Sequence, residues 1–521
     1  MPACPEAEGG TNIPQLTETD PRPARLRFAA LGCAGLVQLA ILAFSQVGFF
    51  WGDEGFHLLA ARLVLSGKAP YLDFFYQHPP LFPYLYAVWM RVFGESWRSA
   101  HALSAILFGA AIALTARYAA SLFPRPAERR TAAALAAGFT ALSLDALRIS
   151  TFALPFALAL LLTLAALSLA AKASNRPGSR EAFWAGACAG GAAMASLFTA
   201  PVGPILFFWL AKNRGSGKRA GKLLAFAGGM FASSLPLLWP AARAPRRVFL
   251  DIVGFHLWFR TGVMAGGAPD PIAAKMRMVG GLLTSPQGIL LALFAGFGLL
   301  AVFSGRTPRP AESRLTVWIA AGLTLFILAP NPSYQHYFVL VIPLLAVLAV
   351  AGLSSLGLLA GAPGLPARAG WIVLGFFILG AGATAHRLGR GLVPFWPDAE
   401  KIAAEVVRLT PEGSRIYAPE VICFLSRRMP PPGLENSFGL QVSDPAAAAL
   451  MGVASERDVD AWISDGRVAT VVLPAESERI ERLGLSRLYG GRVTLVNGFG
   501  PIEIFSGWLG RTGAPTPPER K

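Results

Sequence analysis

Two adjacent carboxylates, Asp53 and Glu54, directly follow an apolar segment, residues 27–50, that is long enough to cross a bilayer. A charged side chain at the bilayer centre costs about 2.5 to 3.5 kcal/mol on insertion scales, so an acid at the exit of a span is either a solvated helix cap or a functional group. A carboxylate in such a place can accept a proton from a hydroxyl nucleophile. The pair is therefore the first candidate for chemistry.

Further ionisable residues fall on the same face of the membrane in the predicted topology, namely His57, His78, Asp145, Arg148, His256, Arg260 and His336. Acids, histidines and arginines together suit a reaction on a lipid-linked substrate. In a sugar carried on a polyprenyl phosphate the phosphate is already a good leaving group, so the enzyme needs a base for the incoming hydroxyl and positive charge beside the departing phosphate. Asp53 would be that base. Arg148, Arg260 or His78 would hold the phosphate, an Arg by its bidentate fork.

Each candidate could also have a purely structural role. Asp53 would then be a plain helix cap, and Glu54 a solvated partner of Arg62 or Lys68. Asp145 and Arg148 lie at helical spacing and would simply pair with each other, and an interfacial amphipathic helix would account for His256 and Arg260, which repeat that spacing. Headgroup contacts would account for His57, aromatic-belt contacts for His336 and Tyr337, and a rigid turn before Pro79 for His78.

The acidic pair must be positioned by the segment that follows it. Phe56, Leu59 and Leu63 recur at helical spacing and predict an amphipathic helix over residues 54–66. We expect this helix to lie along the membrane interface, with His57 off its apolar stripe. An aromatic run then leads to a His-Pro-Pro turn.

The composition indicates a polytopic membrane protein, since 54% of the 521 residues are hydrophobic and 15% are charged. The net charge of +16 does not indicate nucleic-acid binding. Residues 390–521 contain 15 Lys and Arg and 16 Asp and Glu, so the positive excess belongs to the membrane part. The 4 cysteines lie far apart and predict neither a disulfide framework nor a metal site.

Eleven segments are predicted to cross the membrane, namely 27–50, 100–122, 131–144, 151–171, 182–197, 200–211, 223–239, 288–303, 315–328, 337–359 and 370–385. Basic residues cluster in every other connection, as the positive-inside rule requires, provided that residues 80–93 form a second interfacial or re-entrant helix and do not cross. This parity puts the N-terminus in the cytoplasm. It puts five pieces on the outer face, namely 51–98, 145–150, 241–286, 330–336 and the chain after 387.

We therefore predict a polytopic α-helical membrane protein of about 11 transmembrane helices in three parts. Residues 1–25 would be a disordered cytoplasmic tail, residues 26–388 the transmembrane module with its outer-face loop 51–98, and residues 389–521 a small soluble α/β domain. In the last part, 398–409, 456–463 and 476–483 have helical patterns, and 415–417, 468–473, 492–496 and 502–505 are strand-like. We expect this domain to be structural or to dock the acceptor.

These residues resemble the GT-C glycosyltransferases, in particular the bacterial branch similar to protein O-mannosyltransferases, lipid A aminoarabinose transferases and rhizobial lipopolysaccharide core transferases. Those enzymes carry an acidic pair after the first span, an interfacial helix, and a basic residue before Pro-Pro-Leu, here His78-Pro79-Pro80-Leu81. They usually have a second acid in the next outer turn, the place of Asp145. A Tyr that opens a late span with a Pro further on is matched by Tyr337 and Pro343. The resemblance covers about residues 26–360 and the soluble tail.

The resemblance implies that Asp53 is the general base or the acid that orients the acceptor, that Glu54 helps it, and that the reaction inverts the anomeric centre. His78 departs from the aminoarabinose branch, which has a Lys there. A neutral His supplies less positive charge, so the phosphate would rest on Arg148, Arg260, His256 or a divalent metal such as Mg or Mn. Asp53 and Asp145 would be the ligands of any metal.

The predicted protein is thus an enzyme of the bacterial plasma (inner) membrane that transfers a hexose or pentose from a polyprenyl-phosphate donor to a cell-envelope glycan, lipid or protein on the outer face. The alternative from another class is a polytopic transporter or lipid flippase. It explains the membrane part but not an acidic pair outside the membrane or a soluble tail, and no internal repeat is visible in the sequence. A transferase with a dead site, acting as a scaffold, is the third hypothesis.

Overall fold

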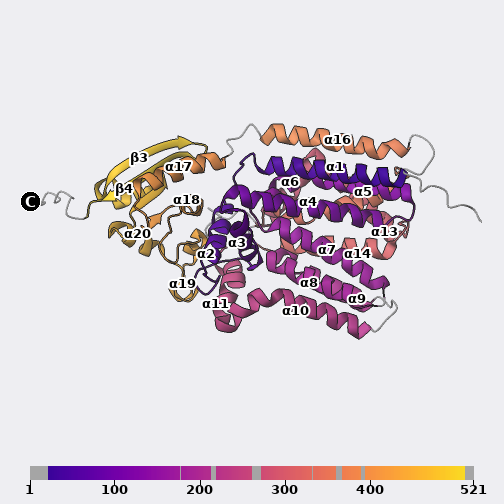
Figure 1. Cartoon of the computed structure of the whole chain (residues 1–521), viewed down its shortest axis with the longest axis horizontal. Coiled ribbons are helices and arrows are strands. Elements are labelled where there is room, and N and C mark those ends of the chain that lie inside the picture. Colours follow the sequence, from indigo (N-terminus) through magenta and orange to yellow (C-terminus); the bar gives the residue numbers. More distant parts are fainter. Residues whose placement is uncertain are drawn as a thin grey trace, which may run out of the picture.

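The computed structural model describes residues 22–176, 178–212, 219–260, 271–330, 333–359, 366–388 and 394–510. Each of the predicted spans coincides with a helix. These helices are α1 (Arg22–Ser45), α4 (Trp97–Ser121), α5 (Pro126–Ala141), α7 (Phe156–Asn175), α8 (Arg180–Ala195), α9 (Val202–Lys212), α10 (Arg219–Arg243), α13 (Pro286–Phe303), α14 (Pro310–Leu328), α15 (Ile342–Ser355) and α16 (Pro366–Leu388). They run side by side in a bundle, and a smaller domain that contains the sheet lies at one end of it (Figure 1).

Five helices in the described part of the chain are long and apolar enough to span a bilayer, namely α4, α7, α10, α13 and residues 311–328 of α14. A sixth candidate is α5 together with α6 (Leu144–Thr151), which are bent by 66° at their junction. Several other apolar helices are shorter than 18 residues. The multi-pass helical fold is therefore confirmed, and the total of about eleven crossings stays a prediction.

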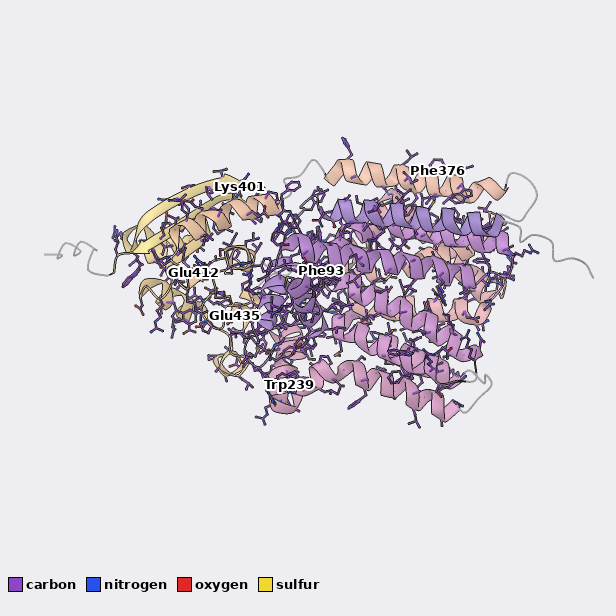
Figure 2. All side chains as sticks on the ribbon, in the orientation of Figure 1. Phe93, Trp239, Phe376, Lys401, Glu412 and Glu435 are labelled. Atoms are coloured by element: carbon purple, nitrogen blue, oxygen red, sulfur yellow. The ribbon has the colours of Figure 1, made fainter. Side chains whose placement is uncertain are left out.

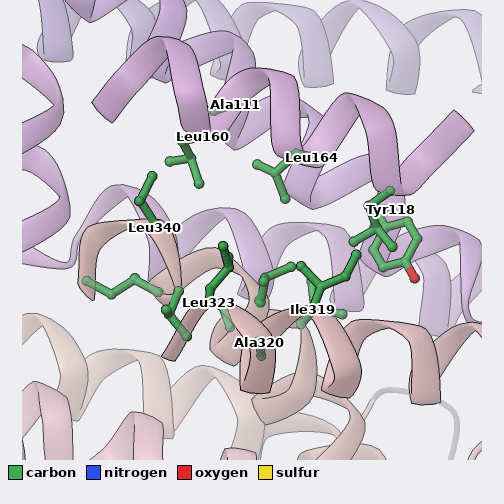
Figure 3. Close-up of a cluster of buried hydrophobic side chains, with 14 of the residues drawn as sticks. Ala111, Tyr118, Leu160, Leu164, Ile319, Ala320, Leu323 and Leu340 are labelled. Carbon is green, nitrogen blue, oxygen red and sulfur yellow. The ribbon is translucent and has the colours of Figure 1, made fainter. Parts of the chain in front are cut away.

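Close packing through small residues holds the bundle together. Where α8 crosses α10, a Cβ added at Gly186 would lie 1.9 Å from the carbonyl oxygen of Phe226, and one added at Gly229 would lie 2.0 Å from that of Phe183. Membrane helices use such residues because they let backbones approach each other. Deeper in the bundle, leucines and isoleucines of α7 and α14 interlock around Leu160, Leu164 and Leu323 (Figure 3).

The C-terminal ends of α4, α7, α9 and α13 lie at the end of the bundle away from the C-terminal domain (Figure 1), and basic residues follow each of them in the sequence. Hydrogen bonds tie this end together: Tyr118 Oη donates to the Glu312 carbonyl at 3.0 Å, and Lys222 Nζ donates to the Ala173 carbonyl at 2.8 Å. The connections that are rich in basic residues, which are every other connection along the chain, thus lie at one end of the bundle, as the sequence predicts. Which end faces the cytoplasm stays a prediction.

The loop after α1 forms α2 (Glu54–Leu65) and α3 (Leu81–Phe93), which lie together where the bundle meets the C-terminal domain (Figure 1). The predicted helix is present, but an exposed polar face is not, because nine of its 12 residues are buried in the protein. Its position at the membrane interface stays a prediction. One side packs on α3, and the other packs so closely on the C-terminal domain that a Cβ at Gly55 would lie 2.7 Å from the Val421 nitrogen. α3 buries Phe82 and Tyr86 and exposes an apolar edge.

Between α10 and α15 the chain forms shorter elements. They are α11 (Pro245–Phe249), the π-helix η2 (Leu250–Phe259), α12 (Pro271–Thr284) and the 3-10 helix η3 (Gln335–Leu340). Earlier in the chain, the short 3-10 helix η1 (Leu197–Thr199) lies between α8 and α9. A π-helix places its side chains differently from an α-helix and often occurs at functional sites.

The C-terminal domain contains a four-stranded sheet of order β1-β2-β4-β3, as the predicted small α/β domain requires. β1 (Ile416–Tyr417) pairs in parallel with β2 (Thr470–Pro474), and the antiparallel hairpin of β3 (Tyr489–Asn497) and β4 (Gly500–Trp508) completes it, with Val472 opposite Ile504. The helices are α17 (Trp396–Leu409), α18 (Glu420–Ser426), η4 (Ser437–Gln441), α19 (Pro445–Met451), α20 (Glu456–Ser464), α21 (Glu478–Leu483) and α22 (Leu485–Leu488).

The surfaces of the two parts differ as a membrane and a soluble part should. Phe376 on α16 and Trp239 on α10 are exposed apolar side chains of the bundle, whereas Lys401 and Glu412 are exposed charges of the C-terminal domain (Figure 2). The bundle surface suits contact with lipid.

Candidate active site

A cavity of about 400 Å³ lies where the bundle, the loop after α1 and the C-terminal domain meet. It brings together six of the nine residues predicted for the site. They are Asp53, His78, His256, Arg260, His336 and Tyr337, and His57 joins them. Residues from four distant parts of the sequence therefore face one space, as the predicted parity of the loops requires.

Asp53 lies at the N-terminus of α2, but its side chain does not cap the helix. The carboxylate instead receives a hydrogen bond from the Trp51 side chain and lies in the field of Arg260. Burial raises the pKa of Asp53, while Arg260 and the Trp51 hydrogen bond oppose that rise. The capping hypothesis is thus wrong for this side chain, and its carboxylate faces the cavity.

Arg260 follows η2, whose last turn aims it into the cavity. Its Nη2 donates to Tyr337 Oη at 3.2 Å, and its Nη1 lies 3.3 Å from His256 Nδ1. Since His256 Nε2 faces the Gln77 carbonyl at 2.9 Å, Nε2 carries the proton and Nδ1 accepts from the guanidinium. Among the described residues that line the cavity, Arg260 is the one Lys or Arg.

The histidines of the cavity form a packed cluster. The rings of His57 and His78 lie 5.1 Å apart, those of His78 and His256 lie 5.8 Å apart, and His57 Nδ1 lies 2.8 Å from Tyr76 Oη. Burial lowers the pKa of His57 to about 3, that of His256 to about 4 and that of His336 to about 3, and it lowers the pKa of His78 well below the usual range. These imidazoles are neutral near pH 7, so they offer hydrogen bonds and not charge.

We expect the buried histidines to make the protein less stable in mild acid. The unfolded chain binds protons on these side chains below about pH 6.5, and the folded chain does not, so the free energy of unfolding falls by about 1.4 kcal/mol per pH unit for each such group as the pH drops from 6 toward 4. The melting temperature of the detergent-solubilised chain should therefore fall between pH 7.5 and 5. His57→Gln should flatten that dependence. An equal pH dependence in the wild type and the variant would contradict neutral burial.

Glu54, predicted as the helper of Asp53, does not line the cavity. Its carboxylate is fully buried and points to α4, where it bonds His101 Nε2 at 2.5 Å. The solvated pairing of Glu54 with Arg62 is also wrong, because Arg62 pairs with Glu95. Neighbouring residues of a helix point about 100° apart, and here Asp53 faces the cavity while Glu54 is turned toward His101 of α4.

Asp145 and Arg148 are on α6 and lie outside the Asp53 cavity in the described structure. Asp145 lines a second cavity of about 460 Å³ among α6, α12, α13 and η3, where it accepts from Gln335 Nε2 at 3.3 Å. η3 forms a wall of both cavities, with His336 and Tyr337 on one and Gln335 on the other. The prediction that Asp145 and Arg148 join the site is therefore not supported by their placement.

The metal-binding expectation has no matching ligand set in the described residues. No group of three or more His, Cys, Asp or Glu side chains there could hold an ion. Asp53 and Asp145, the two expected ligands, line different cavities. These residues therefore do not fit a shared metal.

Several cavity residues were not predicted. Gln77 precedes the predicted His78 and was within reach of sequence reasoning, but Phe438 of η4 was not, because it comes from the C-terminal domain. Asn436 hydrogen-bonds Gln77, and the ring of Phe438 meets that of Phe56 edge-on at 5.5 Å. The C-terminal domain therefore supplies a wall of the cavity.

The comparisons with known proteins agree with this architecture. The family model described as dolichyl-phosphate-mannose-protein mannosyltransferase matches residues 77–239. No curated protein sequence matches the chain. Among solved structures, the chain is similar to ArnT from Cupriavidus metallidurans bound to undecaprenyl phosphate, with 17% identity, a TM-score of 0.62 and coverage of 91% of this chain and 98% of that one.

A second similar structure is the oligosaccharyltransferase AglB from Archaeoglobus fulgidus in complex with an inhibitory peptide and a dolichol-phosphate, with 13% identity, a TM-score of 0.53 and coverage of 95% and 75% of the two chains. The apo form of the Archaeoglobus enzyme matches equally well, with a TM-score of 0.53. The chain thus has the GT-C glycosyltransferase fold, and the predicted resemblance to that superfamily is confirmed.

Proposed function

We propose that the protein is a membrane glycosyltransferase that moves a monosaccharide from a polyprenyl-phosphate donor to a hydroxyl of a cell-envelope acceptor. The observation that carries this proposal is the pairing of one carboxylate, Asp53, with one guanidinium, Arg260, across a cavity that neutral side chains otherwise line. A base and a phosphate-binding cation are what such a transfer needs. The similarity to proteins whose structures contain undecaprenyl phosphate or dolichol-phosphate supports the donor class.

In the proposed reaction the donor phosphate lies against Arg260 and accepts hydrogen bonds from its guanidinium. Asp53 takes the proton of the acceptor hydroxyl as that oxygen attacks the anomeric carbon. The bond from this carbon to the phosphate oxygen breaks, and the polyprenyl phosphate leaves with the electron pair. Attack opposite the leaving group inverts the anomeric centre. The aromatic and aliphatic walls of the cavity keep water from competing as the nucleophile.

The direct test supplies purified protein in liposomes with a radiolabelled polyprenyl-phosphate sugar and an envelope extract from a deletion strain. Incorporation of label into the extract is the expected result, and mass analysis of envelope glycans, lipids and glycoproteins in that strain identifies the missing unit. Flux of the lipid across vesicles without any transfer would instead favour the transporter or flippase. We place the active site and the C-terminal domain on the periplasmic side of the plasma membrane, in line with the basic residues at the opposite end of the bundle.

We further propose that the C-terminal domain helps to bind the acceptor, because Phe438 lines the cavity and Asn436 anchors η4 to Gln77. Phe438→Ala should raise the acceptor KM by about 2- to 10-fold, the size of a lost aromatic contact, and leave the donor KM unchanged. Phe499→Ala is the matched control, since Phe499 packs on Phe50 outside the cavity. A change in the donor KM alone would contradict this role.

A further inference from the structure

The buried pair of Glu54 and His101 is a separate feature behind the wall of the cavity. The two side chains are 0% and 1% exposed, and Glu54 Oε1 lies 2.5 Å from His101 Nε2. The same oxygen accepts from the Ala153 backbone N–H at 2.7 Å, and Glu54 Oε2 accepts from the Trp51 backbone N–H at 3.0 Å. His101 Nδ1 lies 2.9 Å from the Ser45 carbonyl. The Glu54 carboxylate thus bonds three residues, Trp51, His101 and Ala153, and His101 links the pair to Ser45.

The hydrogen-bond partners fix the number of protons in this pair. His101 Nδ1 faces a carbonyl oxygen and must donate. His101 Nε2 faces a carboxylate oxygen that already receives a backbone N–H, so Nε2 is also a donor when Glu54 is ionised. The pair thus shares one proton between His101 Nε2 and Glu54 Oε1, and either position of that proton satisfies the contacts. In both arrangements the buried pair carries no net charge, because His101 compensates Glu54.

The pair fastens two walls of the Asp53 cavity. On one side it holds the Trp51 backbone, and the Trp51 side chain in turn bonds Asp53. On the other side it holds Ala153, directly before the cavity-lining residues 154–156. The Trp51 ring also stacks on Phe152 with centroids 6.2 Å apart, so both walls meet at this indole.

We infer that Glu54 and His101 are positioning residues, which hold Trp51 against Asp53 and keep the charge of Glu54 compensated one residue away from the base. This inference rests on the proposed function, in which Asp53 is that base. The charged and titratable groups that face Asp53 from the surrounding elements are Arg260 after η2, Tyr337 of η3, Glu420 of α18 and Glu54 itself. The cavity histidines beside them are neutral.

Replacing His101 should change the ionisation of Asp53 through Glu54 and Trp51. In His101→Gln the buried Glu54 charge is left uncompensated and the anchor of Trp51 is loosened, and both changes disfavour the ionised form of Asp53. We expect kcat to fall about 10- to 100-fold, as for other residues that orient a functional group, with the donor KM unchanged. The acid limb of the pH profile of kcat/KM should move to higher pH. A residue that only supports the fold would lower the amount of active protein and leave this limb in place.

The matched variants are Glu54→Gln and the double variant with His101→Gln. A Gln at position 54 cannot accept from both backbone N–H groups and also satisfy His101, so it should lower kcat as well. Because the two residues act as one unit, the double variant should be no worse than the more damaged single variant. Losses that multiply in the double variant, or single variants with the kcat and the pH profile of the wild type, would overturn the inference.

A second measurement does not depend on transfer. Carbodiimide modifies protonated carboxyl groups, so the pH at which Asp53 reaches half-maximal labelling, followed by mass spectrometry of the full-length protein, reports the ionisation of this group. The midpoint should shift to higher pH in His101→Gln relative to the wild type. An unchanged midpoint would overturn the inference even if transfer is affected. A shifted midpoint in a protein without transfer activity would support the positioning role and refute the proposed function.

Discussion

Asp53→Asn should insert and fold as the wild type does and transfer no measurable sugar. The amide cannot take the proton of the acceptor hydroxyl, and loss of a positioned base costs about 10²- to 10⁴-fold in rate. Its effect on donor binding should be small, since the group acts on the acceptor. The measurement is the initial rate of label transfer from a polyprenyl-phosphate sugar in liposomes, together with donor binding to the same preparation.

The natural control for this variant is Asp145→Asn. The resemblance to known enzymes predicts Asp145 as a second acid of the site, but the structure places it in the neighbouring cavity beside Gln335. Asp145→Asn should therefore keep most of the transfer rate. Substantial turnover by Asp53→Asn, or equal losses in the two variants, would contradict the assignment of the base to Asp53.

Arg260→Gln should lose transfer chiefly through the donor. Arg260 is the one Lys or Arg among the described residues of the cavity wall, and the imidazoles around it are neutral. Truncating one partner of a desolvated charge pair costs about 2 to 5 kcal/mol, or roughly 30- to several thousand-fold. We expect a higher donor KM, and also a higher pKa of Asp53, because Arg260 opposes the rise that burial causes. Binding of polyprenyl phosphate and the pH profile of kcat/KM measure the two effects.

Two further variants test whether donor binding needs the guanidinium of Arg260 or only a positive charge near the cavity. They are Arg260→Lys and Arg148→Gln. A Lys at position 260 keeps the charge but not the planar fork, so it should recover only part of the lost donor affinity. Arg148 lies on α6, outside the described lining of the Asp53 cavity, and Arg148→Gln should leave the donor KM unchanged. If Arg148→Gln rather than Arg260→Gln raised the donor KM, the phosphate would have to bind elsewhere.

The two cavities also clarify what the acidic residues of the outer face do. Three acids were predicted to act together, yet the structure gives each a different environment. Asp53 faces the cavity with Arg260, Glu54 is bonded to His101 behind the wall, and Asp145 lines the second cavity. Only the first of these placements leaves a carboxylate beside a cation in an enclosed space where a substrate can bind.

Much of the architecture was determined by the sequence itself. The length of an apolar segment and the basic residues of its flanking loops are local properties of the sequence, and they determine whether and in which direction a segment crosses a bilayer. The helices of the bundle and the alternation of their connections could therefore be predicted. The strands of the C-terminal domain were found because side chains alternate along a strand. Asp53, His256 and Arg260 could be nominated because ionisable residues near a membrane need a function or a partner.

Only the tertiary structure decided which of these residues meet. Glu54 turns away from its neighbour because a helix rotates successive side chains by about 100°. The histidines lose their charge because burial penalises the protonated form, an effect that no spacing along the chain reveals. Phe438 reaches the cavity because the C-terminal domain packs onto α2, a contact between segments with no common sequence pattern. Composition therefore determined the kind of protein, and long-range packing selected its candidate site.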